Sequence, residues 1–375
     1  MVEKKKYNEK TEILLNKIQK LYEKSGMIDI NFKDFLKKIK ENSHLNILSK
    51  ELINENNTSI EQLDIKKLYD ILSYNIIGQE EAHKKILSTI WKNFSEHSDK
   101  AENIFVNGPT GVGKTETFQI LANSIDVPII FEDCTKFIVA EEEGDYVEKI
   151  LTDLFIASNG NINKTAHGIV VLDNIDKLAS VASDMPTTNE VLQIILLKMI
   201  DNYKYMINNT ILETKDITFV ALGNYSGIER MNEPILGFNS PQIRKEYKDI
   251  NFNDINDFGI IPEFLRCFPT LISMKALTQN DMKKILLESA NSPLINLKKY
   301  YKHYGVSFTY DNNTILEIVN KAIQYDTGAR GLQTVLTDTT FEADMEIACN
   351  KIGTFKELII SAETINNPKK YILKK

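Results

Sequence analysis

Residues 108–115 are the segment that most constrains this chain. They read GPTGVGKT and match the phosphate-loop pattern G-x-x-x-x-G-K-[ST] at each fixed position. In such a loop, glycines let backbone N–H groups turn toward phosphate oxygens, Lys114 can reach the outer phosphates, and the Thr115 hydroxyl can ligate Mg²⁺. The segment therefore predicts a site for a nucleoside triphosphate. The residues expected to hold it are Gly108, Pro109, Thr110, Gly111, Val112, Gly113, Lys114 and Thr115.

Short apolar runs alternate with helical patterns around this loop. A β-rich run at 104–106 precedes it, and residues 116–124 follow it as a predicted helix whose positive N-terminal end faces the phosphates. Three more apolar runs, at 128–131, 169–172 and 217–222, have the length of buried strands. The alternation predicts an α/β fold in which helices cover both faces of a parallel sheet.

The pattern divides the chain into three regions. Residues 1–65 are predicted to form a helical N-terminal extension with a polar, turn-rich linker at 54–59. Residues 66–270 carry the alternating α/β pattern of a large nucleotide-binding domain. Residues 271–375 are mainly helical, with a β-like run at 358–360, and are expected to form a small helical domain.

The composition argues against several classes of protein. The chain has no apolar run near the roughly 18 residues that span a bilayer, and its start lacks the apolar core of a signal peptide. We therefore expect a cytoplasmic protein that does not act at a membrane. The three cysteines, Cys134, Cys267 and Cys349, are far apart and form no CxxC pair, which argues against a zinc site or a disulfide framework.

Charge is distributed unevenly along the chain. The formal net charge is −7, yet residues 1–40 hold eleven lysines and only six acidic residues. This basic arm could contact nucleic acid or an acidic partner, but we favour a solvated helical surface. Because no recognised nucleic-acid-binding motif accompanies it, we expect no nucleic-acid partner.

A second nucleotide motif ends the apolar run at 169–172. Asp173 follows this run and is predicted to help hold Mg²⁺ through its water shell, as in a Walker B strand. The next residue is Asn174, at a position where active ATPases of this design carry a glutamate that activates water. Asparagine can hydrogen-bond a water but cannot accept its proton, and loss of a general base costs roughly 10²–10⁴ in rate. Asp176 lies past the expected strand end, and we assign it no role as a base.

Asn224 follows the apolar run at 217–222. A polar side chain at the tip of a neighbouring strand can position a water or sense the γ-phosphate. The alternative is an ordinary asparagine in a turn, and beside the other motifs we favour the sensor role.

Together these motifs resemble the AAA+ ATPases, and in particular the ClpX unfoldases, over residues 66–375. Ile76 and Ile77 lie in a segment similar to the box whose apolar residues flank adenine. Residues 259–264 closely resemble the segment that leads to the family's arginine finger. Residues 327–332 resemble its sensor-2 motif, in which Arg330 would contact the γ-phosphate from the same subunit.

The resemblance implies an architecture and a set of partners. It implies a large domain with a five-stranded parallel sheet, a small helical domain, and ATP with Mg²⁺ in the cleft between them. It further implies a ring, normally of six copies, in which a neighbour's arginine completes each site and a protein client or partner is remodelled.

Other segments depart from the ClpX pattern. Arg266 lies one residue before the finger position, which holds Cys267, and on a helix this shift turns the side chain by about 100°. Because a trans arginine is worth roughly 10³–10⁵ in turnover, the shift would silence hydrolysis unless local unwinding restores its aim. The pore-loop segment 141–144 reads Glu-Glu-Glu-Gly in place of an aromatic grip, so like charges would crowd the axis of a ring. No cysteine precedes Cys134, so we expect no counterpart here of the family's N-terminal zinc module.

Residues 235–239 resemble the Ile-Gly-Phe loop that docks the unfoldase onto the ClpP peptidase. Leu236, Gly237 and Phe238 would suit an apolar socket, although a turn that faces the core is the alternative.

Two functions therefore stand beside each other. In the first, the chain binds Mg-ATP at a subunit interface and remodels or regulates a protein partner, with slow or impaired hydrolysis. In the second, it is an active ATP-dependent unfoldase that works with a ClpP-type peptidase. Asn174, Arg266 and the acidic segment 141–144 favour the first.

Overall fold

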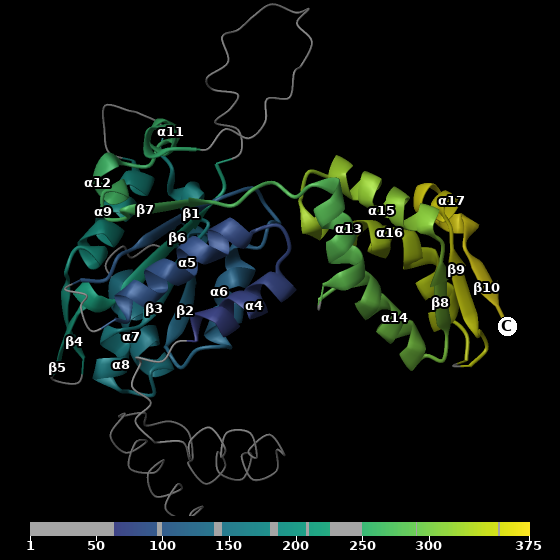
Figure 1. Cartoon of the computed structure of the whole chain (residues 1–375), viewed down its shortest axis with the longest axis horizontal. Coiled ribbons are helices and arrows are strands. Elements are labelled where there is room, and N and C mark those ends of the chain that lie inside the picture. The colour runs from purple at the N-terminus through teal and green to yellow at the C-terminus, as the bar shows by residue number, and fades with distance from the viewer. Residues whose placement is uncertain are drawn as a thin grey trace, which may run out of the picture. The chain divides into compact units, whose positions relative to one another are not determined.

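Figure 1 shows the computed structural model of the chain. The structure describes residues 64–95, 100–138, 145–180, 187–207, 210–225, 250–289, 291–351 and 353–375. All of them belong to the compact unit Ile60–Lys375, so the predicted extension 1–65 lies almost entirely outside the described residues. Within the described ranges, no helix combines the length and the apolar character needed to cross a membrane.

The centre of the unit is a five-stranded parallel sheet with the strand order β2-β3-β6-β1-β7 (Figure 1). The strands are β1 (Ile104–Asn107), β2 (Ile129–Asp133), β3 (Ile169–Asp173), β6 (Thr218–Gly223) and β7 (Thr270–Ser273). The first four confirm the strands predicted from the apolar runs, with bounds within two residues. Because β7 pairs with β1, the sheet extends three residues beyond the domain boundary that we predicted at residue 270.

Both faces of the sheet are buried, and side chains alternate between them. On β1, Phe105 packs into one hydrophobic cluster, whereas Ile104 and Val106 pack into the other. The Phe105 face is covered by α7 (Asp145–Ala157), α8 (Ile162–Ala166), α9 (Thr188–Ile200), α11 (Phe252–Phe258) and α12 (Pro262–Leu265). The opposite face is covered by α4 (Ile65–Asn75), α5 (Glu80–Asn93) and α6 (Lys114–Ala122). The predicted two-sided helical cover is therefore confirmed.

Short elements complete this part of the chain. They are the 3₁₀ turns η2 (Cys134–Ile138), η3 (Ile175–Leu178) and η4 (Thr214–Asp216), and the antiparallel hairpin of β4 (Lys204–Ile207) and β5 (Thr210–Glu213).

The C-terminal region has a separate hydrophobic cluster and combines helices with a small sheet. Its helices are α13 (Gln279–Glu288), α14 (Pro293–His303), α15 (Asn312–Gln324), α16 (Ala329–Ala348) and α17 (Ala362–Asn366), with the 3₁₀ turn η5 (Pro368–Lys370). The sheet has the order β10-β9-β8, from β8 (Ser307–Tyr310), β9 (Glu357–Ile360) and β10 (Ile372–Lys374). The β-like run at 358–360 is confirmed as β9, whereas its two partners were not predicted.

The segment between the two regions is tied to the start of α5. Gln79 is buried, and its side chain makes two hydrogen bonds with the backbone of Lys275: Nε2 donates to the carbonyl oxygen at 2.8 Å, and Oε1 accepts from the N–H at 3.0 Å. The N–H of Met274 donates to the carbonyl of Asn107 at 2.7 Å. The last residue of β1 is therefore held in place directly before the phosphate loop.

His83, on α5, is also a buried polar residue, but unlike Gln79 its side chain has no hydrogen-bond partner among the described residues. Its side chain is 0% exposed, and neither ring nitrogen has a hydrogen-bond partner among the residues that the structure describes. Burial lowers the pKa of His83 to about 4 because the charged form loses its hydration, and the nearby charge of Glu80 offsets only part of this shift.

We expect His83 to make the fold sensitive to acid. The unfolded chain binds the proton near pH 6.5 and the folded chain only near pH 4. The contribution of His83 to the free energy of unfolding is therefore constant above pH 6.5 and falls as the pH drops toward 4, by up to about 1.4 kcal/mol per pH unit. His83→Leu should flatten this slope. It should also raise stability at neutral pH by about 1 kcal/mol, because two unpaired polar atoms leave the core. Urea denaturation at several pH values measures both effects, and parallel pH profiles for the two proteins would contradict the assignment.

Candidate nucleotide-binding site

The phosphate loop leads from the centre of the sheet into a helix. It begins directly after β1, and α6 starts at Lys114 with Gly113 as its N-cap, two residues before the predicted start at 116. The first N–H groups of a helix have no carbonyl partner within it and carry the positive end of the helix dipole. Unpaired donors therefore lie where phosphate oxygens would approach.

Position 113 requires glycine for two reasons, its backbone conformation and the closeness of a neighbouring side chain. Its φ is +100°, in the left-handed region, and a Cβ at this position would lie 2.8 Å from Cγ2 of Ile76. Ile76 is buried and Ile77 is half-buried. The structure thus places Ile76, in the segment predicted to flank adenine, against Gly113 of the phosphate loop.

Other loop residues hold the loop to the core. Val112 is buried in the cluster beneath α4, α5 and α6. The N–H of Gly108 donates to the carbonyl of Gly223 at 3.3 Å, which ties the start of the loop to the end of β6. These two residues therefore hold the loop against the sheet and the helices beneath it.

Lys114 lies inside the loop, with its ammonium group against the loop backbone. Nζ donates to the carbonyl oxygens of Gly108 at 2.6 Å and Pro109 at 2.8 Å. Burial lowers the pKa of Lys114 to about 8. The carboxylates of Asp176 and Asp173 oppose this shift.

Thr115 and Asp173, the two residues predicted to hold Mg²⁺, are hydrogen-bonded to each other. The Thr115 hydroxyl donates to Oδ2 of Asp173 at 2.8 Å. Thr115 is the second residue of α6, and Asp173 is the last residue of β3. A hydroxyl and a carboxylate are oxygen ligands of the type that Mg²⁺ prefers.

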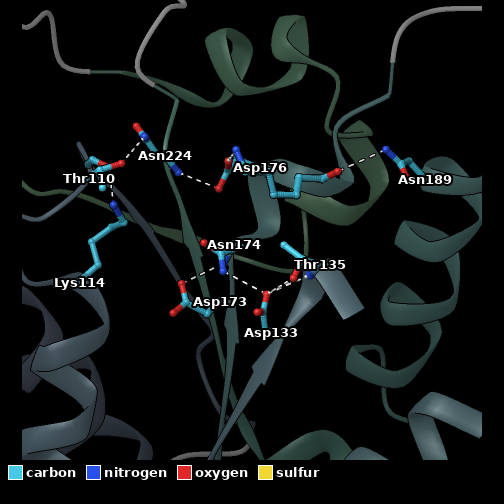
Figure 2. Close-up of polar contacts among 11 residues, drawn as sticks. Thr110, Lys114, Asp133, Thr135, Asp173, Asn174, Asp176, Asn189 and Asn224 are labelled. Carbon is cyan, nitrogen blue, oxygen red and sulfur yellow. Dashed lines mark hydrogen bonds and ion pairs between the residues drawn. The ribbon is translucent and has the colours of Figure 1, made fainter. Parts of the chain in front are cut away.

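Asn174 is held at both its backbone and its side chain (Figure 2). Its φ is +59°, which asparagine tolerates, and its N–H donates to Oδ1 of Asp173 at 2.9 Å. Its Nδ2 donates to Oδ1 of Asp133 at 3.0 Å. Because the amide nitrogen faces a carboxylate, the amide oxygen is the atom of this side chain that can accept a hydrogen bond from water.

Asp133 is a site residue that our sequence analysis missed. It ends β2 and is the register partner of Asp173 on β3. Its Oδ1 also accepts from the N–H of Thr135 at 3.0 Å and from the Thr135 hydroxyl at 2.8 Å. Burial alone would raise the pKa of Asp133, but the hydrogen bonds from Asn174 and Thr135 outweigh it and hold the pKa below its usual value. Asp133 could have been identified from the sequence, because it is an acidic residue at the end of β2, the strand next to β3.

Asn224 lies between Asp176 and the phosphate loop (Figure 2). Its N–H donates to Oδ1 of Asp176 at 3.0 Å, and its Nδ2 donates to Oγ1 of Thr110 at 2.8 Å. Asp176 is 7% exposed and also pairs with Lys177 at 3.1 Å. The structure therefore places Asn224 at the loop, as a sensor role requires. Asp176 anchors the backbone of Asn224 there.

The start of α16 packs against the same loop. The N–H of Ala329 donates to the carbonyl of Gly111 at 3.1 Å. Arg330 is the second residue of α16, and its side chain is exposed. Its guanidinium is close enough to Lys114 to add to the lowering of the pKa of that lysine. The predicted sensor-2 residue and the phosphate loop thus share one region of the structure.

A comparison with known families identifies the large domain. Residues 99–271 match the family model described as AAA domain (Cdc48 subfamily). This part of the chain has the fold of an AAA domain. Its five-stranded parallel sheet and its phosphate loop after β1 agree with the fold that the resemblance implied.

Curated relatives of the AAA domain and its flanking segments carry the name ATP-dependent Clp protease ATP-binding subunit ClpX. The protein of Borrelia duttonii is 29% identical over 337 residues, which cover 80% of this chain and 78% of the relative. The protein of Treponema denticola is 27% identical over 338 residues, which cover 80% and 81%. The protein of Bacteroides thetaiotaomicron is 29% identical over 323 residues, which cover 76% and 77%. The chain is therefore similar to ClpX beyond the AAA domain itself.

Arg266 is the C-cap residue that follows the short helix α12, and its side chain is exposed. Its φ of −62° and ψ of −21° are helical, so the backbone is not unwound at this residue. Cys267, at the finger position, is half-buried and packs against the cluster that contains Phe105. The arginine thus reaches solvent from the position before the one that the ClpX pattern uses.

Some predicted segments lie outside the described residues. They are the acidic segment 141–144 and the segment 235–239, which contains Leu236, Gly237 and Phe238.

We expect the affinity of the loop for Mg-ATP to fall at alkaline pH. The charged form of Lys114 would bind phosphate oxygens, and with a pKa of about 8 the neutral fraction of this lysine grows as the pH rises above that value. The Kd should increase by up to about tenfold per pH unit above this point, with uptake of a proton on binding. Titration calorimetry in two buffers with different ionisation enthalpies measures the uptake. A Kd that stays constant between pH 7 and 9 would contradict this assignment.

Proposed function

We propose that the chain binds Mg-ATP at this loop, at an interface between subunits, and that it remodels or regulates a protein partner with slow hydrolysis. The AAA domain and the similarity to ClpX proteins support nucleotide binding and action on proteins. The observation that supports slow hydrolysis is the asparagine at position 174, which is hydrogen-bonded to Asp133.

The residues at the carboxyl edge of the sheet suit Mg-ATP. Thr115 and Asp173 would hold the ion, directly and through its water shell, since their oxygens lie 2.8 Å apart. Lys114 and the N-terminus of α6 would bind the phosphates, and Ile76 and Ile77 would flank the base. When bound, the ion neutralises charge that develops on the phosphates.

Slow hydrolysis follows from the two side chains beside Asp173. The amide oxygen of Asn174 can orient a water, but it cannot take the proton that the water must lose. Asp133 is the carboxylate next to this amide, and its low pKa makes it a weak base. The site therefore favours a long-lived complex in which ATP acts as a conformational ligand.

We further propose that copies of the chain assemble into a ring, hexameric or of another size. A residue that acts on a neighbour's nucleotide must be accessible, and the exposure of Arg266 meets this condition. Arg330 would contact the γ-phosphate within its own subunit, since α16 begins against the phosphate loop.

Asn174→Glu should raise the rate of ATP hydrolysis by about tenfold or more, because it supplies a general base. The neighbouring Asp133 carboxylate should also raise the pKa of the new glutamate toward neutrality, where a base works best. Asn174→Gln, which keeps an amide, is the matched control and should stay slow. Single-turnover hydrolysis measures all three, and a wild-type rate equal to that of Asn174→Glu would argue against the proposal.

The double variant Asn174→Glu/Cys267→Arg separates the effect of the missing general base from the effect of the displaced arginine. If the missing base alone limits the rate, adding the arginine changes little. If the displaced arginine also limits it, the double variant should exceed Asn174→Glu by a further large factor, since a trans arginine is worth roughly 10³–10⁵.

A second function is favoured by the relatives. Their name assigns them to a Clp protease as its ATP-binding subunit, and the alignment spans 78% of the Borrelia duttonii protein. In this alternative the chain is an active unfoldase that docks on a ClpP-type peptidase through Leu236, Gly237 and Phe238.

Under this alternative, Phe238→Ala should weaken binding to a ClpP-type peptidase by about tenfold or more, because an aromatic anchor in a socket carries much of the binding energy. Ile211→Ala, which truncates an exposed apolar side chain of β5, is the control and should bind normally. Peptidase binding in the presence of Mg-ATP, measured by light scattering or sedimentation, tests this. Absence of any complex with the wild-type chain would exclude the alternative.

A further inference from the structure

Thr110 is a loop residue that touches both predicted sensor segments. Its side-chain oxygen accepts a hydrogen bond from Nδ2 of Asn224 at 2.8 Å (Figure 2). Its carbonyl oxygen lies against Gly328, where a Cβ would approach to 2.5 Å. The side chain and the backbone of one residue thus face two segments that are far apart in the sequence.

Asn224 is hydrogen-bonded to the loop through its side chain and to Asp176 through its backbone. Its backbone is anchored by the bond from its N–H to Asp176, a buried carboxylate that Lys177 also holds. This anchor fixes where the residue sits at the end of β6. The bond to the Thr110 hydroxyl then turns its amide toward the phosphate loop.

The turn before α16 is held to the loop independently. The N–H of Ala329 donates to the carbonyl of Gly111, the residue after Thr110. Gly328 has a φ of +59°, which glycine adopts without strain, and this lets the turn approach the Thr110 carbonyl closely.

We propose that Thr110 is a positioning residue that holds Asn224 at the γ-phosphate end of the site and keeps it in register with the turn at 327–329. This inference rests on the proposed binding of Mg-ATP and deepens it, because it names how the loop distinguishes a triphosphate from a diphosphate.

Asp176 places Asn224 at that end of the site. Its carboxylate accepts the N–H of Asn224, whose side chain bonds to Thr110. The preceding residue, Pro109, accepts a hydrogen bond from Lys114, the loop residue expected to reach the outer phosphates. Loosening Asn224 should therefore affect a nucleotide that carries a γ-phosphate more than one that lacks it.

Thr110→Val and Thr110→Ser form a matched pair of variants in the full chain. Valine keeps the branched shape but removes the hydroxyl, whereas serine keeps the hydroxyl. The quantity to measure is the ratio of the Kd for Mg-ADP to the Kd for the non-hydrolysable analogue Mg-AMPPNP. Thr110→Val should lower this ratio by roughly 2- to 10-fold, the range expected for one hydrogen bond, and Thr110→Ser should keep it near the wild-type value. Equal ratios in all three proteins, or equal losses in both variants, would overturn the proposal.

Gly328→Ala tests the second contact of Thr110. Its Cβ would press on the Thr110 carbonyl and should also lower the ratio. If Thr110 links the two segments, the double variant with Thr110→Val should change the ratio by less than the product of the two single effects. Effects that multiply would overturn the link between the segments. The Thr110 pair tests the positioning of Asn224 even where Gly328→Ala does not fold.

The two proposals fail in different ways. A wild-type chain that binds neither nucleotide would contradict the proposed function. A wild-type chain that binds both, with a ratio that Thr110→Val leaves unchanged, would contradict only the role of Thr110.

Discussion

Burial of the central sheet on both faces is the constraint on which the site depends. Helices on each side allow all five strands to run parallel, and parallel strands end at the same edge. β3, β6 and β1 are consecutive in the sheet, so Asp173, Asn224 and the phosphate loop come from three adjacent strand ends. Neighbouring strands lie about 4.8 Å apart, which brings side chains at their ends within hydrogen-bonding reach.

At this edge the side chains of Asn174 and Asn224 have hydrogen-bond partners within the protein. Asn174 is bound to Asp133, and Asn224 is bound to both Asp176 and Thr110. Hydrogen bonds in a partly buried network are stronger than those exposed to water, so these side chains hold one another in defined orientations. The asparagine at position 174 is therefore part of this network, hydrogen-bonded to Asp173 through its backbone and to Asp133 through its side chain.

Much of the fold follows from local patterns that are visible in the sequence. Four strands of the main sheet are continuous apolar runs, and β9 is found for the same reason. β8 and β10 were missed because they are short and half-exposed, so their residues form no apolar run, and they become strands only by pairing with β9. The start of α6 differed from prediction because Gly113 caps the helix at Lys114, inside the motif itself.

The sequence alone determined the chemistry of the loop, because the order Gly-x-x-x-x-Gly-Lys-Thr specifies backbone freedom and charge within eight consecutive residues. It also determined that position 174 carries an amide where a carboxylate is expected. Only the tertiary structure decided which residues surround these groups. Asp133 reaches Asn174, and Thr110 reaches Asn224, because strand pairing aligns the ends of strands that are far apart in the chain, and no local pattern records that alignment.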